Sequence, residues 1–170
     1  YRGELVYKIS DVLKVRGLVG KSIKNPTFTE RFGFYTNFIG NPLLKPEESV
    51  GFEIGMDYVF ENEQIDMSLT LFNADLENEI NGFVYDPVTY AYTSGNMNGS
   101  SNRKGLEISL VGDLTETLSF SSSYTHVKAD QKNDGTRVRE IRRPNHMANF
   151  GINWAPSSSV KVMMLSLIHI

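Results

Sequence analysis

The sequence predicts an all-β chain, a fragment of a transmembrane antiparallel β-barrel. Two observations predict it: long segments in which every second residue is apolar, and connections that alternate between short and long. Because successive side chains of a strand point to opposite faces, this period of two gives each strand one apolar and one polar face. Outer-membrane barrels combine such strands with short periplasmic turns and long extracellular loops.

The clearest strand covers residues 49–60. Its apolar face holds Val50, Phe52, Ile54, Met56, Tyr58 and Phe60, and its polar face holds Ser49, Gly51, Glu53, Gly55 and Asp57. At the usual rise its length is about 33 Å. That exceeds the roughly 5–6 residues of a common globular strand and matches the roughly 9–11 residues of a tilted strand that crosses a bilayer.

The same alternation recurs along the chain. It predicts strands over 5–9, 13–19, 65–71, 106–110, 118–125 and 148–154, and a final strand that begins near Val160. With the strand at 49–60, this makes about eight strands, and no helix is predicted.

The connections between these strands indicate an orientation. Short turns are expected at 10–11, 61–64, 115–116 and 156–159, and long loops at 22–48, 77–103 and 128–144. A soluble sandwich has no reason to gather its long loops at one end. The strand ends at the short turns carry aromatic residues, as the girdle of a barrel does: Tyr7, Tyr58, Phe60 and Trp154.

The polar face has two readings. It carries Arg16, Glu53, Asp57, Asp66, Glu107 and Asn149. These side chains would line the lumen of a barrel or the solvent face of a soluble β-sandwich. Alternation alone does not separate the two; strand length and loop asymmetry favour the barrel.

Composition narrows the function classes. The 170 residues have a net charge of −3 and no cysteine, which gives no support for nucleic-acid binding, disulfides or thiolate chemistry. No stretch approaches the about 18 apolar residues of a membrane-spanning helix. No nucleophile with a positioned base is recognisable, so we do not expect an enzyme.

The sequence allows a prediction for each end of the chain. The first residues already read as strand, so the chain is expected to begin inside a protein. Leu165 to Ile170 resemble the translation of a sequencing adapter. We therefore expect a partial barrel over 1–164 and a non-native tail over 165–170.

Three motifs, in order, resemble the barrel of TonB-dependent outer-membrane receptors. The first is an Asn-Pro-x-Leu-x-Pro-Glu loop that follows an Asn-Pro-Thr-Phe stretch at 25–28. The second is a Gly-x-Glu strand opening, and the third is an Arg-x-Pro-x-His strand start. The matching residues are Asn41, Pro42, Leu44, Pro46 and Glu47, then Gly105 and Glu107, then Arg142, Pro144 and His146.

This resemblance implies a 22-stranded barrel closed by an N-terminal plug, in the outer membrane of a Gram-negative bacterium. Such receptors import a scarce nutrient, among them iron–siderophore complexes, haem and cobalamin, with energy from the TonB complex. The spacing of 30–42 is most similar to the cobalamin branch. The chain would supply about eight strands and lack the plug, so it would contact TonB only through a missing N-terminal part. A passive porin-like channel is the alternative among membrane proteins.

The Asn-Pro loop also has a physical interpretation. Pro42 and Pro46 fix φ and bias the residues before them towards extended backbone. Glu47 stands at the strand entrance, where its carboxylate can accept loop backbone N–H groups. We expect this loop to set the register of the following strand, rather than to touch a ligand, and we expect the same role for Pro144.

Aromatic clusters in the expected loops at 22–48 and 77–103, and one basic run, are candidate ligand contacts. The residues singled out are Phe34, Tyr35, Tyr85, Tyr90, Tyr92 and Arg139. Rigid aromatics are good binding surfaces, but such loops also pack on themselves. The run at 137–143 could meet an anionic siderophore or lipopolysaccharide phosphates, or be a solvated loop. Outer-membrane lipid and a metal chelate are thus expected partners, with no nucleic acid.

No metal site or cofactor is expected. His146 is expected to face outward at the rim, His126 is isolated in sequence, and His169 lies in the doubtful tail. An Asn-Asp-Gly sequence at 133–135 could hold calcium, but is usually only a turn.

Overall fold

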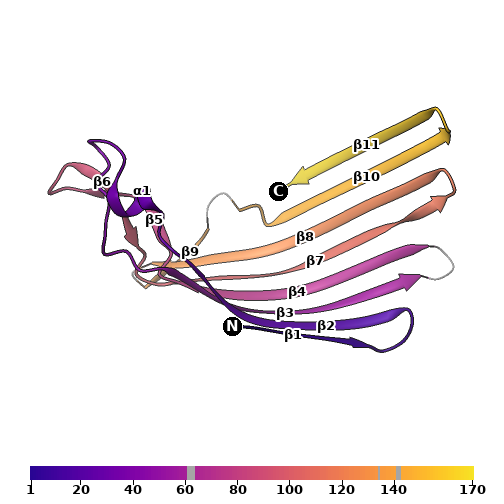
Figure 1. The fold of residues 1–170 in the computed structure, drawn as a ribbon, viewed down its shortest axis with the longest axis horizontal. Coiled ribbons are helices and arrows are strands. Elements are labelled where there is room, and N and C mark those ends of the chain that lie inside the picture. Colours follow the sequence, from indigo (N-terminus) through magenta and orange to yellow (C-terminus); the bar gives the residue numbers. More distant parts are fainter. Residues whose placement is uncertain (61–63, 134, 141–142) are drawn as a thin grey trace.

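In the computed structural model, the long strands form one curved antiparallel sheet (Figure 1). The structure describes residues 1–60, 64–133, 135–140 and 143–170. The sheet order is β1-β2-β3-β4-β7-β8-β10-β11, and β9 pairs with β8. These strands are β1 (Arg2–Lys8), β2 (Leu13–Lys24), β3 (Glu47–Phe60), β4 (Ile65–Glu77), β7 (Ser100–Thr115), β8 (Leu118–Asn133), β9 (Thr136–Arg139), β10 (His146–Ser157) and β11 (Val160–His169). The predicted all-β class is confirmed, and each expected strand is present.

The connections divide between the two ends of the sheet. Figure 1 shows the short turns at one end, with the helix α1 (Phe28–Phe32) and the hairpin of β5 (Ile80–Asp86) and β6 (Ala91–Asn96) beyond the other. In the first short turn, the N–H groups of Ile9 and Ser10 donate to the carbonyl of Leu13 at 2.9 and 3.2 Å. Of the turn expected at 61–64, residues 61–63 lie outside the described residues.

The strands are longer than their alternation indicates. β2 extends to Lys24 and pairs with β3 as far as Lys24 opposite Glu47. The prediction of a loop over 128–144 is wrong, because β8 continues to Asn133 and pairs with β9 in a further hairpin. Beyond the apolar band both faces of the strands carry polar residues, so the period of two disappears while the hydrogen-bonded ladder continues. Of the expected turn at 133–135, Asp134 lies outside the described residues.

The expectation of no helix is also wrong. α1 begins after Thr27, whose side chain accepts the N–H of Glu30 at 3.3 Å, while the Glu30 carboxylate accepts the N–H of Thr27 at 2.7 Å. This reciprocal pair is a capping box, which satisfies two of the free N–H groups of a helix start. Gly33 caps the end of this helix, and its φ of +75° favours glycine.

One face of the sheet is apolar and uncovered. On this face the side chains are uncharged from the short turns to Val19 on β2, Phe52 on β3, Leu71 on β4 and Leu106 on β7. Its side chains are exposed, for example Leu5 at 72% and Ile54 at 58%. In the part of the chain that the structure describes, no second sheet covers them, which does not favour the two packed sheets of a soluble sandwich. A span such as Val50 to Phe60, tilted at roughly 40°, crosses the about 25 Å apolar band of an outer-membrane barrel.

The opposite face holds a polar network. Arg16 donates to Ser68 Oγ at 3.1 Å and Thr70 Oγ1 at 2.6 Å, and its Nε lies 3.4 Å from Asp57 Oδ2. A Cβ at Gly55 would lie 2.6 Å from the Arg16 guanidinium carbon, so Gly55 leaves the room in which this side chain crosses β3. The register places Glu53, Asp66, Glu107 and Asn149 on this same face, as expected for a lumen wall. No helix in the described residues is long and apolar enough to cross a membrane.

Candidate functional site

The loops beyond the sheet bring two aromatic clusters into one. From the segment after α1, Phe34 packs on Tyr35 and Phe38 with ring centroids 4.3 and 4.9 Å apart. From the β5–β6 hairpin, Tyr92 packs on Phe83 and Tyr85 at 6.2 and 5.6 Å. Phe38 and Phe83 join the two groups at 5.5 Å. These six residues, Phe34, Tyr35, Phe38, Phe83, Tyr85 and Tyr92, are called the aromatic platform below.

Backbone hydrogen bonds fix the platform in place. Ile39 N–H donates to the Tyr92 carbonyl at 2.8 Å, and Tyr92 N–H donates to the Asn37 carbonyl at 2.9 Å. The side chain of Phe38 is buried, with 4% of its surface exposed. Two loops that are more than forty residues apart in sequence therefore form one unit. Sequence reasoning treated them separately, because nothing local to either loop indicates the other.

Several platform rings remain open to solvent. Phe34, Tyr35, Tyr85 and Tyr92 each expose about half of their surface, between 47% and 57%. Rigid, half-exposed aromatic rings lose little conformational entropy when they contact a ligand. The platform can therefore bind a flat or apolar ligand surface at the loop end of the barrel.

Two of the predicted contact residues lie outside the platform. Tyr90 is 80% exposed and has φ of +57° at the tip of the β5–β6 hairpin. Arg139 is on β9 and donates to the carbonyl of Arg143 at 3.3 Å. Among the described residues, the ring of Tyr90 does not pair with a platform ring, and the hydrogen bond of Arg139 goes to Arg143 rather than to the platform. Arg142 of the basic run lies outside the described residues.

The Asn-Pro loop is tied to the same hairpin. Asn41 Nδ2 donates to the Ser94 carbonyl at 3.0 Å, and its Oδ1 accepts the Leu43 N–H at 3.0 Å. The backbone N–H of Lys45 donates to Asn96 Oδ1 at 2.8 Å, and Asn96 Nδ2 donates to the Lys45 carbonyl at 2.9 Å. Leu44, which is buried, lies between these ties. Pro42 and Pro46 thus restrict the backbone of a loop that is also held by hydrogen bonds to the β5–β6 hairpin.

Glu47 joins three segments at the end of this loop. Its Oε1 accepts the backbone N–H of Ile80 at 2.9 Å and lies 3.0 Å from Lys24 Nζ. The carboxylate therefore connects the first residue of β3 to the end of β2 and to the start of β5. These contacts hold the platform at a fixed position relative to the sheet.

A partly buried ion network that sequence reasoning missed lies near the start of β7. Arg103 donates to Glu79 at 2.6 Å and to both carboxylate oxygens of Glu140 at 2.9 and 3.2 Å. The Ser101 hydroxyl also donates to Glu79, and Arg143 to Glu140. Since these residues come from β7 and two separate loops, no sequence spacing could have indicated the network.

Acid should weaken the start of α1. The Thr27 backbone N–H, helped by its hydroxyl and opposed by partial burial, holds the pKa of Glu30 below its usual range. Because folding lowers this pKa, ionised Glu30 stabilises the folded helix start at pH values above the ordinary carboxyl pKa. This stabilisation is lost as the pH falls through the lowered value. We expect amide-exchange protection over 28–33 to fall about fivefold between pH 6 and pH 3, which is the size of a typical cap. A Glu30→Gln variant should show little of this pH dependence, and Glu116→Gln, at the opposite end of the sheet, should behave like the parent.

The other motif residues have structural surroundings. A Cβ at Gly105 would lie 2.0 Å from the His126 carbonyl oxygen and 2.9 Å from the Phe72 ring. Glu107 is opposite Thr70 on the polar face. Pro144 precedes β10. His126, which is isolated in sequence, is directly opposite His146 in the sheet, with ring centroids 4.6 Å apart. The cross-strand register brings them together, which sequence separation hides.

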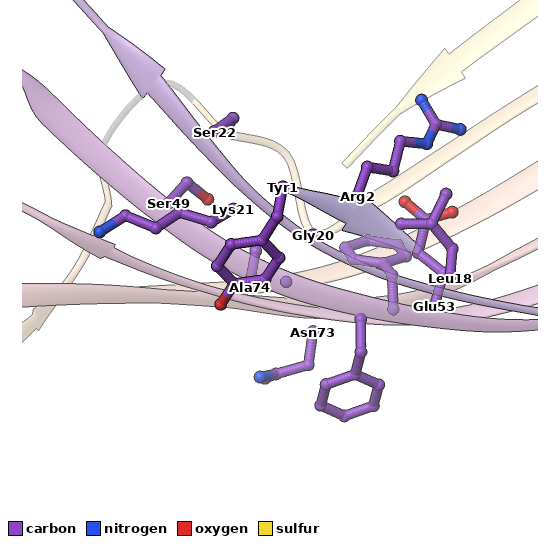
Figure 2. Close-up of a pocket in the computed structure, with 13 residues that line it drawn as sticks. Tyr1, Arg2, Leu18, Gly20, Lys21, Ser22, Ser49, Glu53, Asn73 and Ala74 are labelled. Carbon is purple, nitrogen blue, oxygen red and sulfur yellow. The ribbon is translucent and has the colours of Figure 1, made fainter. Parts of the chain in front are cut away.

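A depression of about 350 Å³ lies on the wall formed by β1 to β4 (Figure 2). Gly20, Gly51 and Ala74 are in register on the polar face, so this level of the wall lacks large side chains. Tyr1 and Glu53 are among the residues around it. It is separate from the aromatic platform, with which it shares no lining residue.

Comparison with known proteins gives a consistent result. The family model described as "TonB dependent receptor-like, beta-barrel" matches residues 1–161. The chain is 26% identical over 166 residues to the iron-regulated outer membrane virulence protein of Vibrio cholerae, covering 88% of this chain and 25% of that protein. It is 30% identical over 152 residues to the vitamin B12 transporter BtuB of Photobacterium profundum, covering 87% and 23%.

A solved structure has the same fold. The siderophore receptor PirA from Pseudomonas aeruginosa superposes with a TM-score of 0.77 over 99% of this chain and 30% of that one, at 21% identity. The chain spans about a quarter of the length of the curated relatives named above.

The barrel interpretation and the resemblance are thus confirmed. So is the outer membrane of a Gram-negative bacterium as the location. The family is one of transport receptors rather than enzymes. The chain belongs to the TonB-dependent receptor family and forms part of its β-barrel domain.

Proposed function

We propose that the chain is a segment of a receptor that takes up a scarce nutrient with energy supplied through the TonB complex. An iron–siderophore complex, haem or a cobalamin is the expected type of cargo. The parent receptor would contact TonB through a part outside this chain. The family match supports this reading over a passive channel, and relatives named as a B12 transporter and as siderophore receptors indicate the cargo class.

The aromatic platform is the single observation that supports a binding role for this segment. It places four half-exposed rings on a backbone fixed by loop-to-loop hydrogen bonds. Catecholate, hydroxamate and corrin ligands all present flat or apolar surfaces that such rings can contact. The platform is therefore proposed as one wall of the external binding site.

Removing platform rings should weaken cargo binding. In the purified full-length receptor, we expect Tyr35→Ala and Tyr85→Ala each to raise the Kd of the cargo about tenfold, since an aromatic contact residue is typically worth more than 1 kcal/mol. The cargo is first found by growth promotion with ferric siderophores, haem and cobalamin, and the Kd is then measured by calorimetry. Buried Phe38 is left intact, because its loss would disturb the loops themselves.

Tyr90→Ala is the matched control. Tyr90 has the same side chain on the same hairpin, but it lies outside the platform. An equal loss of affinity in Tyr90→Ala and Tyr85→Ala would contradict the platform as the contact surface. Uptake that continues at the same rate in cells without TonB would instead contradict the energised receptor and favour the passive channel.

A further inference from the structure

Two histidine rings meet on the outward face of the sheet, at the loop end of β8 and β10. His126 and His146 are directly opposite one another in the register, and their ring centroids are 4.6 Å apart. They share the face of Phe150, so they point away from the lumen, and both are partly exposed. His126 and His146 are called the histidine pair below. The sequence alone does not predict the pair, because its members lie on different strands.

Hydrogen bonds occupy the same nitrogen in both rings. His126 Nδ1 lies 3.1 Å from the Asn145 carbonyl oxygen. A carbonyl only accepts, so Nδ1 carries the hydrogen and Nε2 of the neutral ring carries the lone pair. His146 Nδ1 lies 2.7 Å from Tyr124 Oη, and a phenol oxygen can accept this N–H in the same way. Nε2 is therefore the atom of each ring that is left to bind a ligand.

Both Nε2 atoms are accessible from outside the chain. Within the described residues, neither of them has a hydrogen-bond partner. Each buried side-chain nitrogen or oxygen in that part of the chain does have one, so the two Nε2 atoms are not buried. A neutral imidazole that donates its other N–H to a backbone carbonyl or a similar oxygen is the usual form of a metal-bound histidine.

The separation of the rings fits two ligands of one metal ion. A metal ion about 2.0–2.1 Å from a histidine nitrogen lies roughly 3.2 Å from the centroid of that ring. Two such rings at a right angle around the ion have centroids about 4.5 Å apart, and at the tetrahedral angle about 5.2 Å. The rings of the pair are 4.6 Å apart and tilted by 33°. This distance matches the right angle, which Cu²⁺ and Ni²⁺ adopt with nitrogen ligands.

We propose that the histidine pair binds a divalent transition-metal ion through the two Nε2 atoms, with Cu²⁺ held most tightly. Cu²⁺ stands highest in the affinity order of these ions for nitrogen ligands. Binding replaces two water ligands of the ion by two neutral imidazoles, and no proton or electron is transferred. The described part of the chain contains no group of three or more histidine, cysteine or acidic residues that could hold a metal. Water therefore fills the remaining ligand positions of the ion.

The surroundings of the pair give water access to the ion and limit its affinity. Lys128 follows His126 on the same face, and Leu106, directly opposite His126, begins the uncharged surface. The pair thus lies where charged residues give way to apolar ones. Lys128 repels a cation, but its side chain is 62% exposed, so water and salt screen this repulsion. Because the site faces away from the lumen, the ion would connect β8 to β10 from outside the barrel rather than be cargo.

Copper binding to the purified full-length receptor without cargo tests the proposal. Cu²⁺ is titrated by calorimetry, and electron paramagnetic resonance gives the number of nitrogen ligands. Copper sites elsewhere in the receptor cancel in the difference between the parent and a His126→Asn/His146→Asn double variant. We expect this difference to be one Cu²⁺ with two nitrogen ligands. His126→Asn and His146→Asn should each raise the Kd of this site at least about tenfold, since even the loss of an outer-shell partner costs about 10–100-fold.

Tyr124→Phe separates positioning from metal binding. This variant keeps both histidines but removes the oxygen that holds His146 Nδ1. We expect a Kd about tenfold higher, as for the loss of an outer-shell partner, with the two-nitrogen spectrum unchanged.

Lys128→Gln is the control for a change of charge beside the pair. It should lower the Kd for Cu²⁺ about twofold, because a screened repulsion is removed. Identical copper binding in the parent and the double histidine variant would overturn the proposal. So would a loss of affinity in Lys128→Gln as large as that in His126→Asn. Heat-dependent migration on SDS gels verifies that each variant keeps a folded barrel. Because cargo is absent, failure here leaves the proposed transport function unaffected.

Discussion

Arg103→Met should lower the free energy of unfolding of the loop end by about 3 kcal/mol, because removing the shared cation of a partly buried ion network leaves two carboxylates uncompensated. Arg103 is the shared cation of Glu79 and Glu140. The exposed fractions of the three side chains are 24%, 16% and 9%. Among the described residues, the partners that would remain without Arg103 are the Ser101 hydroxyl for Glu79 and Arg143 for Glu140.

Hydrogen exchange of the full-length receptor measures this effect locally. Backbone amides around Glu79 and Glu140 should exchange roughly a hundredfold faster in the variant, as about 3 kcal/mol implies. The strand centres of β3 and β4, far from the network, should be unchanged. Adding Glu79→Gln and Glu140→Gln to Arg103→Met should recover much of the protection, because the uncompensated charges are then removed.

Arg2→Met is the control for charge removal alone. Arg2 and Glu4 form an exposed pair at 3.4 Å, with side chains 69% and 52% accessible. Such surface pairs contribute about 0–1 kcal/mol. If Arg2→Met and Arg103→Met changed exchange equally, the partly buried network would not be what holds the two loops.

Gly105→Ala should destabilise the barrel by about 2–3 kcal/mol, the upper part of the range for inserting atoms into a site without room. The added Cβ would lie 2.0 Å from the His126 carbonyl oxygen and 2.9 Å from the Phe72 ring. The ring can rotate away, but the carbonyl belongs to the neighbouring strand. Relief therefore requires β7 and β8 to separate locally.

Denaturant unfolding of the full-length receptor in lipid, followed by gel migration, measures this loss. Gly17→Ala is the matched control, since the nearest atom to its new Cβ is a backbone oxygen 4.0 Å away. Phe72→Leu in the Gly105→Ala background should restore only part of the stability, because the backbone contact remains. A Gly105→Ala protein as stable as Gly17→Ala would refute the steric explanation of this motif glycine.

The sequence predicts the membrane-spanning part of the fold well, because one physical constraint acts there. Lipid on one face and polar groups on the other force a period of two, as in residues 49–60. Above the band both faces carry polar residues, so neither the extension of β8 to Asn133 nor the β8–β9 hairpin could be read from alternation. Thr27 and Glu30 did carry a capping signal, but a helix of only five residues has no periodicity to support it.

The candidate site was predictable only in its parts. Phe34, Tyr35, Tyr85 and Tyr92 stand out because aromatic residues are unusual in long loops. The two groups are joined by Phe38 and Phe83, which lie on either side of the β3–β4 hairpin in the sequence and are in contact in the fold. The network of Arg103, Glu79 and Glu140 likewise requires distant loops to converge, and the His126–His146 pair requires the β8–β10 register. The expectations for Pro144 and for the origin of residues 165–170 stay predictions.

The joining of the two loops has a consequence for engineering ligand preference. Residues 33–38 and 83–92 share ring contacts and backbone hydrogen bonds, and the Asn-Pro loop ties both to the sheet through Asn41 and Glu47. A single loop transplanted from another receptor would arrive without its complementary half. The smallest exchangeable cassette is therefore the continuous stretch 25–96, which carries the two loops, their tether and the β3–β4 hairpin between them.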